Sequence, residues 1–314
     1  MRNQDTAQFL KLLEVLNEST KEVNMIQVTK GKLETAKKIV IYGPEGIGKS
    51  TLASYFPKSV FIDTEGSTKA LDVARYPEVK DWTAIKTFVE DAVNSRQFLT
   101  IVIDTADWAE RFCTRSICKA HKVQGIEDIP YGKGYTYVME EFAGLLDVCN
   151  RAIAAGINVV FTAHAQMRKF EQPDEMGSYD RWEMKLSKKT APLLKEWADM
   201  VLFCNYKTKL ITDSKTQSKK AMGGKRVMYA SHHPCWDAKN RYGLQDEMDM
   251  EFSQIAHLFD SKPTEPNYRL ELRSLIAEKG LDSNAIALSF GLNKNSTNAD
   301  YKNAYESIKK TGGK

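Results

Sequence analysis

The segment 43–50 has the residue types and the spacing of a phosphate-binding loop. It reads Gly-Pro-Glu-Gly-Ile-Gly-Lys-Ser, and it lies between a short apolar run and a helical pattern. Glycines let backbone N–H groups approach phosphate oxygens, and the positive end of the helix dipole strengthens the attraction. In such a loop Lys49 reaches the β- and γ-phosphates of a nucleoside triphosphate such as ATP, and the Ser50 hydroxyl ligates Mg²⁺. The predicted nucleotide contacts are Gly43, Pro44, Glu45, Gly46, Ile47, Gly48, Lys49, Ser50 and Thr51.

An acidic residue ends a second apolar run. Residues 100–104 read Thr-Ile-Val-Ile-Asp. Downstream of a phosphate-binding loop, a strand that ends in aspartate places a carboxylate beside the water shell of Mg²⁺. We therefore predict Asp104 and Ser50 as the metal-binding residues. Thr105 follows Asp104, so the adjacent Asp-Glu pair of AAA+ ATPases is absent and the catalytic base must lie elsewhere.

Three short segments together resemble one family. Segments 42–51, 63–66 (Asp-Thr-Glu-Gly) and 162–165 (Thr-Ala-His-Ala) are similar to those of phage-encoded RecA-like ATPases of the Sak single-strand annealing group, relatives of RecA and RadA. The resemblance covers about residues 27–243. It implies single-stranded DNA binding, annealing or recombination, and cooperation with a single-strand-binding protein. It also implies a ring or filament of identical chains in the cytoplasm of a host cell.

The resemblance assigns the catalytic base. In the RecA family a glutamate after the second strand orients the attacking water, and here Glu65 follows the apolar run 60–63. Asp63 is the alternative base. A solvated loop carboxylate is the plainer interpretation of Glu65, because acidic residues at strand ends are common on surfaces.

Two further sites rest on the same resemblance. His164 stands where these ATPases place a polar residue that senses the γ-phosphate, with Gln166 as the alternative sensor. Lys239 and Arg241 lie in Ala-Lys-Asn-Arg-Tyr-Gly, which is similar to a motif whose cations act on nucleotide bound by a neighbouring subunit. Arginine suits the charge that builds on a transferring phosphoryl group. A core histidine and a solvated basic turn are the plainer interpretations.

Two polar segments favour a DNA partner independently of the family. Segment 166–187 interleaves cations with aromatic rings, and segment 205–226 is rich in lysine. A single-strand binder combines cations on phosphates with aromatic rings beneath bases. The first segment also holds acidic residues, so a solvated surface is the alternative for both. The predicted DNA contacts are Arg168, Lys169, Tyr179, Arg181, Trp182, Lys219, Lys220, Lys225 and Arg226.

Short apolar runs must form the scaffold that brings these residues together. The runs lie at 38–42, 60–63, 99–104, 158–163 and 200–203, and they alternate with helical patterns at 83–94, 106–121 and 135–155. Such alternation predicts an α/β fold, a parallel sheet flanked by helices on both faces, which in this family is the RecA-like P-loop NTPase core. Longer irregular stretches are expected at 123–134 and 166–187, and a hairpin at 205–226.

The chain divides into three predicted parts. An amphipathic helix is expected within residues 1–25, the ATPase core over 26–260, and a small helical unit over 266–314. The helices of this last unit are expected at 268–279, 283–290 and 300–310. A Pro-Thr-Glu-Pro segment at 263–266 marks the second boundary.

Composition narrows the class of protein. The 314 residues carry a formal net charge of +4, which permits a polyanionic partner without demanding one. No run approaches the roughly 18 apolar residues of a membrane span. The five cysteines are scattered and odd in number, which favours reduced thiols and a cytoplasmic location. The paired CxxC spacing of structural zinc sites is missing, so zinc is a minor alternative.

Two functions remain open from the sequence. The first is an ATP-hydrolysing, single-stranded-DNA-binding protein of recombination or annealing. The second is a nucleotide-driven switch or assembly ATPase whose partner is a protein. A small-molecule kinase is a distant third, because the sequence offers no lid or acceptor site. Stimulation of ATP turnover by DNA would separate the first two.

Overall fold

The computed structural model describes residues 30–31, 33–171, 177–212, 219–259, 268–293 and 296–310, without the side chains of 209–212, 219–222, 270 and 310. The chain divides into two compact units, residues 1–35 and 36–314. The predicted helix within residues 1–25 and the boundary at 263–266 lie outside the described residues.

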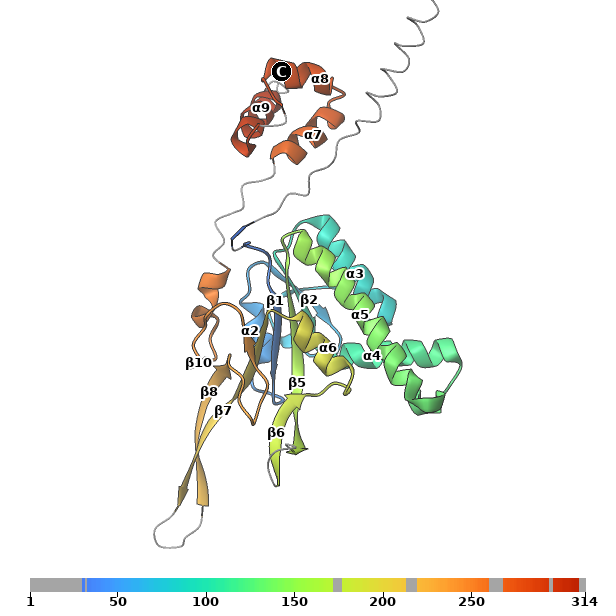
Figure 1. Cartoon of the computed structure of the whole chain (residues 1–314), viewed down its shortest axis with the longest axis vertical. Helices are drawn as coiled ribbons and strands as arrows, with labels where there is room; N and C mark the ends of the chain where they lie inside the picture. Colours follow the sequence, from blue (N-terminus) through green and yellow to red (C-terminus); the bar gives the residue numbers. More distant parts are fainter. Residues whose placement is uncertain are drawn as a thin grey trace, which may run out of the picture. The chain divides into compact units, whose positions relative to one another are not determined.

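A mostly parallel sheet forms the core of the second unit (Figure 1). At its centre β1 (Lys38–Gly43) lies between β5 (Asn158–Glu171) and β7 (Met200–Thr212), and all three run parallel. The strand order is β10-β8-β7-β1-β5-β4-β2-β3. The remaining strands are β2 (Ser59–Asp63), β3 (Ala74–Arg75), β4 (Thr100–Asp104), β6 (Ser178–Met184), β8 (Lys219–Tyr229), β9 (Lys239–Asn240) and β10 (Glu247–Asp249). The predicted α/β fold is confirmed.

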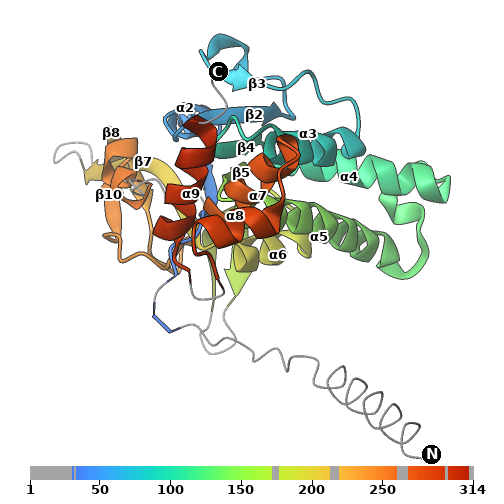
Figure 2. The ribbon, with the colours of Figure 1, turned by 90° about the horizontal axis from the view of Figure 1, so that it is seen from above.

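Helices cover both faces of the sheet (Figure 2). Side chains alternate along β1, so Val40 and Tyr42 join the core under one set of helices while Ile39 and Ile41 join the core on the opposite face. The first face carries α3 (Trp82–Ser95), α4 (Ala106–His121), α5 (Lys133–Ala154) and α6 (Thr190–Trp197). The second carries α2 (Lys49–Ser54) and the turns at 252–258.

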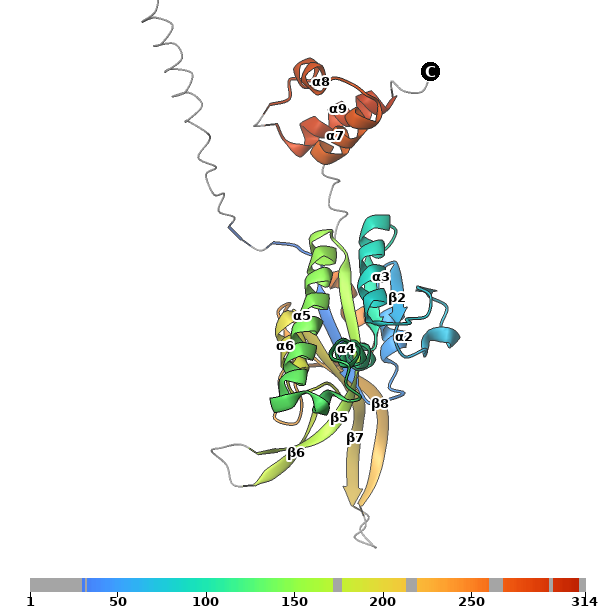
Figure 3. The same ribbon diagram turned by 90° about the vertical axis from the view of Figure 1, so that its right-hand side faces the viewer.

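Two hairpins extend beyond the carboxyl ends of the parallel strands (Figure 3). The pairing of β5 with β1 ends at His164, and β5 then pairs with the antiparallel β6 from Ala165 to Glu171. The predicted irregular stretch at 166–187 is therefore wrong: most of its described residues form a β-hairpin. Cross-strand pairs such as Phe170 with Tyr179 stabilise it. The hairpin predicted at 205–226 is confirmed as β7–β8, and β8 also includes most of the separate strand expected at 227–230.

Helices occupy the end of the described chain. They are α7 (Tyr268–Glu278), α8 (Ser283–Ser289) and α9 (Asn298–Lys310), close to the predicted bounds. Leu272, Ala304 and Ile308 form their shared apolar core. Among the described residues, no helix combines the length and the apolar character needed to cross a membrane.

Candidate nucleotide site

The phosphate-binding loop joins β1 to α2, at the carboxyl edge of the sheet. Gly46 and Gly48 have φ of 73° and 105°, a backbone region that favours glycine. A Cβ at Gly43 would lie 2.3 Å from the carbonyl oxygen of Cys204, so β7 can pack against the loop only because this residue is glycine. The sequence motif thus forms the tight turn that it predicted.

Lys49 holds its ammonium group inside this turn. The side chain is buried, and its Nζ donates to the carbonyl oxygens of Gly43 (3.1 Å) and Pro44 (2.9 Å). Burial lowers the pKa of Lys49, while the negative charges of Asp104 and Asp107 act in the opposite direction. The ammonium therefore lies where the loop can present it to phosphate oxygens.

Asp104 supplies a carboxylate oxygen suited to a metal ion. The residue is fully buried at the end of β4; its Oδ1 accepts a hydrogen bond from Thr162, and its Oδ2 has no hydrogen-bond partner. Burial raises the pKa of Asp104, and hydrogen bonds with Thr162 and Ser50 oppose this. A buried carboxylate oxygen without a partner, beside a hydroxyl, fits the oxygen ligands and bound waters that Mg²⁺ prefers. Asp104 and Ser50 are therefore the residues that would hold it.

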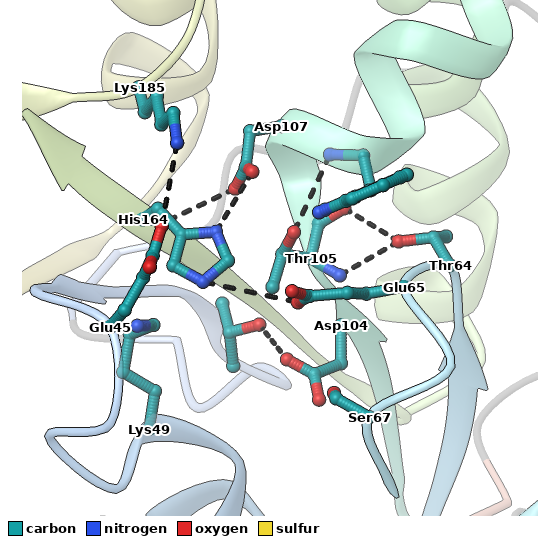
Figure 4. A network of polar contacts seen from close by, with 12 residues as sticks. Glu45, Lys49, Thr64, Glu65, Ser67, Asp104, Thr105, Asp107, His164 and Lys185 are labelled. Atoms are coloured by element: carbon teal, nitrogen blue, oxygen red, sulfur yellow. Dashed lines mark hydrogen bonds and ion pairs between the residues drawn. The ribbon is translucent and has the colours of Figure 1, made fainter.

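A pair of threonines joins the ends of β2 and β4. The Thr64 hydroxyl donates to the carbonyl oxygen of Thr105 (2.9 Å) and accepts from the Thr105 N–H (2.8 Å). In addition, Asp63 and Asp104 are paired in register. These contacts place Glu65, the next residue after Thr64, above the end of β4 (Figure 4).

Asp63 organises the loop that carries Glu65. Its Oδ1 accepts from the N–H groups of Glu65, Gly66 and Ser67, and its Oδ2 accepts from the N–H and hydroxyl of Thr68. Burial acts to raise the pKa of Asp63, but these hydrogen bonds lower it overall. A carboxylate with this many donors is a weak base. The geometry therefore favours Glu65 over the alternative, Asp63.

Glu65 is surrounded by charged groups. Its side chain is 28% exposed. Burial is the largest cause that raises its pKa, and the negative charges of Asp107 and Asp104 add to this, while His164 and Lys49 oppose it. A carboxylate with a raised pKa accepts a proton more readily than an ordinary one.

His164 connects Glu65 to a buried aspartate. Its Nδ1 lies 2.9 Å from Asp107 Oδ2, and its backbone N–H donates to Asp107 Oδ1 (3.0 Å). The other ring nitrogen, Nε2, lies 3.9 Å from Glu65 Oε2. Although burial raises the pKa of Asp107, the hydrogen bonds with His164 lower it overall. The core-histidine alternative therefore accounts for only half of the geometry, because one ring nitrogen meets Asp107 and the other faces Glu65.

Sequence reasoning missed Asp107. It lies in the first turn of α4, three residues after Asp104, where a carboxylate also suits the helix dipole. Gln166, the alternative sensor, donates from Nε2 to the carbonyl oxygen of Met184 (3.2 Å) within the β5–β6 hairpin. Gln166 is thus held within the hairpin, whereas His164 faces Glu65.

Glu45 contacts the chain just after the β5–β6 hairpin. Its carboxylate lies 3.5 Å from the Nζ of Lys185, which follows β6 (Figure 4). Both side chains are exposed, so the pair contributes little to stability. It does place one end of the phosphate-binding loop beside the β5–β6 hairpin.

Lys239 and Arg241 lie at the opposite edge of the sheet from the phosphate-binding loop. Lys239 pairs with Val201 near the start of β7, and its Nζ donates to the carbonyl oxygens of Lys195, Glu196 and Ala198 at the end of α6. Arg241 forms an ion pair with Asp199 (2.8 Å), and its side chain is 59% exposed. Within one chain these cations therefore do not join the nucleotide site.

The β5–β6 hairpin buries part of its predicted DNA surface. Arg181 is buried, paired with Asp237, and its guanidinium stacks on the Phe170 ring (4.9 Å). The Trp182 ring is half-buried and packs near Phe203 (6.1 Å). Arg181 is therefore held by contacts within the chain and is a poor candidate for a phosphate contact, whereas the half-buried Trp182 stays a prediction.

The other residues of this hairpin differ in exposure. Tyr179 packs on Phe170 and its hydroxyl is buried. Arg168 is half-buried and forms an ion pair with Glu183 (3.6 Å). Lys169 is exposed. Of the five contacts predicted here, Lys169 keeps a side chain free for a partner.

The β7–β8 hairpin places its predicted DNA contacts in different surroundings. Lys225 pairs with Asp249 (2.6 Å), and Arg226 donates to the carbonyl oxygen of Ile47 (3.3 Å) in the phosphate-binding loop. The side chains of Lys219 and Lys220 lie outside the described part of the chain. Arg226 therefore lies beside the phosphate-binding loop.

The cysteines do not form a metal site in the described part of the chain. Cys113, Cys118, Cys149 and Cys204 are buried, and all five are free thiols. Among the described residues, no group of three or more His, Cys, Asp or Glu side chains could hold a metal ion. A protein-only zinc cage is thus absent there, whereas Mg²⁺ at Asp104 and Ser50 would take its other ligands from phosphates and water.

The chain is similar to known proteins over its core. The model of one family, described as AAA domain, matches residues 35–242. A KaiC-like protein from the archaeon Pyrococcus horikoshii OT3 is 13% identical, with 62% of this chain and 77% of that chain covered and a TM-score of 0.33. The flagellar accessory protein FlaH from Methanocaldococcus jannaschii is 14% identical, with 63% and 79% covered and a TM-score of 0.31. No curated protein matches.

Proposed function

The chain belongs to the AAA domain family, and we propose that it is an ATPase that binds ATP with Mg²⁺ at the phosphate-binding loop and hydrolyses it with Glu65 as the base. One observation carries the proposal: Lys49, Asp104 and Glu65 meet at the carboxyl edge of the sheet, close enough for their charges to shift one another's pKa. This is the set of groups that phosphoryl transfer to water requires, a phosphate-binding cation, a metal-side carboxylate and a base.

Each residue has a distinct task in this mechanism. Backbone N–H groups of the loop and the Lys49 ammonium bind the phosphates. When bound, Mg²⁺ supplies positive charge that offsets the charge on the phosphate oxygens. Glu65 accepts a proton from the attacking water, and its raised pKa suits this task. His164, oriented by Asp107, presents Nε2 towards Glu65, and its task in this mechanism is to sense the terminal phosphate.

Replacement of the base tests the proposal. Glu65→Gln should keep affinity for ATP but lose turnover by roughly 10²-fold or more, because an amide cannot accept the proton. Glu78→Gln is a matched control, since Glu78 is an exposed carboxylate in the loop after β3. Turnover at the wild-type rate in Glu65→Gln would reject Glu65 as the base. A wild-type chain that binds no ATP in the presence of Mg²⁺ would reject the whole proposal.

Single-stranded DNA is the partner that we propose for this ATPase. Tyr131 supports it: the residue is 96% exposed in the loop between α4 and α5, and its backbone takes a left-handed conformation with φ of 59°. An exposed aromatic ring close to Lys133 offers a stacking surface and a cation together. Lys169 of the β5–β6 hairpin is also exposed. On this proposal, as in the Sak group that the sequence resembles, ATP turnover would drive annealing or recombination with a single-strand-binding protein.

A titration with DNA separates this partner from the alternative. ATP turnover and the fluorescence anisotropy of a labelled oligo-dT should both respond when the two are mixed at low salt. The anisotropy response should be stronger with a slowly hydrolysed ATP analogue than without nucleotide, because the β5–β6 hairpin continues directly from His164. If DNA neither binds nor changes turnover while ATP is hydrolysed, a switch or assembly ATPase with a protein partner is favoured.

Assembly of identical chains is a further part of the proposal. Arg241 is its better candidate, because its side chain is largely exposed while Lys239 holds the end of α6. Mixing inactive Lys49→Ala with inactive Arg241→Ala should restore some turnover at interfaces that pair an intact loop with an intact Arg241. Full turnover by a strictly monomeric chain would reject a role across an interface.

A further inference from the structure

Arg226 approaches the phosphate-binding loop from β8 of the same chain. Its Nη1 donates to the carbonyl oxygen of Ile47 (3.3 Å), and the same atom lies 2.9 Å from the position that a Cβ would take at Gly48. The guanidinium therefore lies against the middle of the loop. It does so although Ile47 and Arg226 are 179 positions apart in the sequence.

The pairing of Arg226 differs from that of the neighbouring cations. On the two hairpins the described ion pairs are Lys207–Glu247, Lys225–Asp249, Arg168–Glu183 and Arg181–Asp237. Arg226 forms no ion pair with a described carboxylate; the contact with Ile47 uses one of its five N–H donors. Arg226 is also exposed to solvent. An arginine with unused donors at a phosphate-binding loop has the geometry to bind phosphate oxygens in pairs.

We propose that Arg226 contacts the α- and β-phosphates of a nucleotide bound to its own chain, an inference that rests on the proposed ATPase function. Two facts select these phosphates. The loop residues around Gly48 present their N–H groups to the α- and β-phosphates. In addition, β8 lies on one side of β1, whereas β5, β4 and β2, which carry His164, Asp104 and Glu65, lie on the other. Arg226 and the groups assigned to the γ-phosphate therefore approach from opposite sides.

Affinities for two nucleotides test this contact. Wild type, Arg226→Gln, Arg226→Lys and Lys225→Gln would be titrated with ADP and with a slowly hydrolysed ATP analogue, both with Mg²⁺. Arg226→Gln should bind both nucleotides roughly 10- to 100-fold more weakly, because a hydrogen bond to a charged group is lost. Arg226→Lys keeps the charge and should lose less. Lys225→Gln is the matched control, because Lys225 is adjacent on β8 but pairs with Asp249, and its affinities should not change.

These titrations, together with a titration of labelled oligo-dT without nucleotide, can overturn the proposal in several ways. Gln can still donate to the carbonyl oxygen of Ile47, so wild-type affinity in Arg226→Gln would show that the arginine only supports the loop. Arg226→Lys no tighter than Arg226→Gln would exclude a charge-dependent contact. A loss confined to the ATP analogue would assign Arg226 to the γ-phosphate. Weaker oligo-dT binding without nucleotide, with unchanged nucleotide affinity, would restore it to a DNA surface. If wild type binds neither nucleotide, the proposed function itself fails.

Discussion

The nucleotide site and the two hairpins are both rich in charge, but they use it differently. At the site, Asp104 keeps a buried oxygen without a partner, and Glu65 keeps a raised pKa. On the hairpins, Arg181 and Lys225 are already paired with carboxylates of the same chain. A polar group with unused hydrogen-bonding capacity indicates a ligand site, whereas a cation that is already paired with a carboxylate indicates a role in stability. Charge composition alone does not separate the two, but the pairing of each group does.

Removal of the loop cation should give the largest effect. Lys49→Ala should weaken ATP binding by roughly 10³-fold, because contacts between the ammonium and two phosphates, each a hydrogen bond to a charged group, are lost together. Hydrolysis should disappear with binding. Calorimetric titration of ATP with Mg²⁺ measures the affinity. Lys58→Ala is the control, because Lys58 lies outside the loop motif. Unchanged affinity in Lys49→Ala would mean that the site lies elsewhere.

The buried hairpin arginine should behave as a structural residue. Arg181→Met should lower the free energy of unfolding by about 3 kcal/mol, because it removes one partner of a buried ion pair. Lys195 remains 2.8 Å from Asp237 and limits the loss. Lys169→Met on the paired strand is the control and should change stability by less than about 0.5 kcal/mol. Urea unfolding of both variants measures the difference. Equal stability would place Arg181 back among the candidates for DNA contact.

The aspartate behind His164 should affect turnover more than binding. Asp107→Asn leaves an amide in place of the carboxylate that orients the imidazole, so turnover should fall roughly 10-fold or more by loss of a charge-assisted hydrogen bond. Affinity for ATP should change little, because Asp107 contacts His164 and not the loop. Steady-state kinetics separates the two quantities. A change in affinity alone, with turnover preserved, would contradict the positioning role.

These residues show which parts of the molecule a sequence can predict. The loop 43–50 is local, so its spacing alone predicted the turn that the structure forms, while the roles of Lys49 and Ser50 stay predictions. The strands of the parallel core were also predictable, because each is a short apolar run. The contact between Asp107 and His164 spans 57 positions, and that between Arg181 and Asp237 spans 56. Neither contact leaves a recognisable pattern among neighbouring residues of the sequence.

The β5–β6 hairpin was not predicted from the sequence for the same reason. Its residues 166–171 and 178–184 mix charged and aromatic side chains, and what makes them strands is the pairing of one with the other. Cross-strand contacts are the unit of sheet stability, and they are invisible in a single run of residues. Arg226 is the extreme case, since its place beside the phosphate-binding loop depends on the register of β7 with β8.

The pH dependence of turnover should shift in opposite directions in two variants. Glu65 must be deprotonated to act as a base, so turnover should fall as the pH drops through its pKa, which lies above the ordinary value of 4.5. His164 lowers this pKa and Asp107 raises it. The acidic limb of turnover should therefore move to higher pH in His164→Gln and to lower pH in Asp107→Asn. Profiles of turnover at saturating ATP measure it. Shifts in the same direction would contradict Glu65 as the titrating group.

The smallest effect should come from the hairpin cation that has no role in the fold. If Lys169 contacts a DNA phosphate, Lys169→Ala should reduce the salt dependence of oligo-dT binding by a log–log slope of about 0.7. Between 50 and 200 mM salt, a fourfold range, that slope corresponds to about a 2.6-fold difference in affinity.

Tyr131→Ala should act differently: lost stacking would cost roughly 1–3 kcal/mol at every salt concentration, with the slope unchanged. Anisotropy titrations of labelled oligo-dT over a salt series distinguish the two. A Lys169→Ala slope equal to that of wild type would reject Lys169 as a phosphate contact.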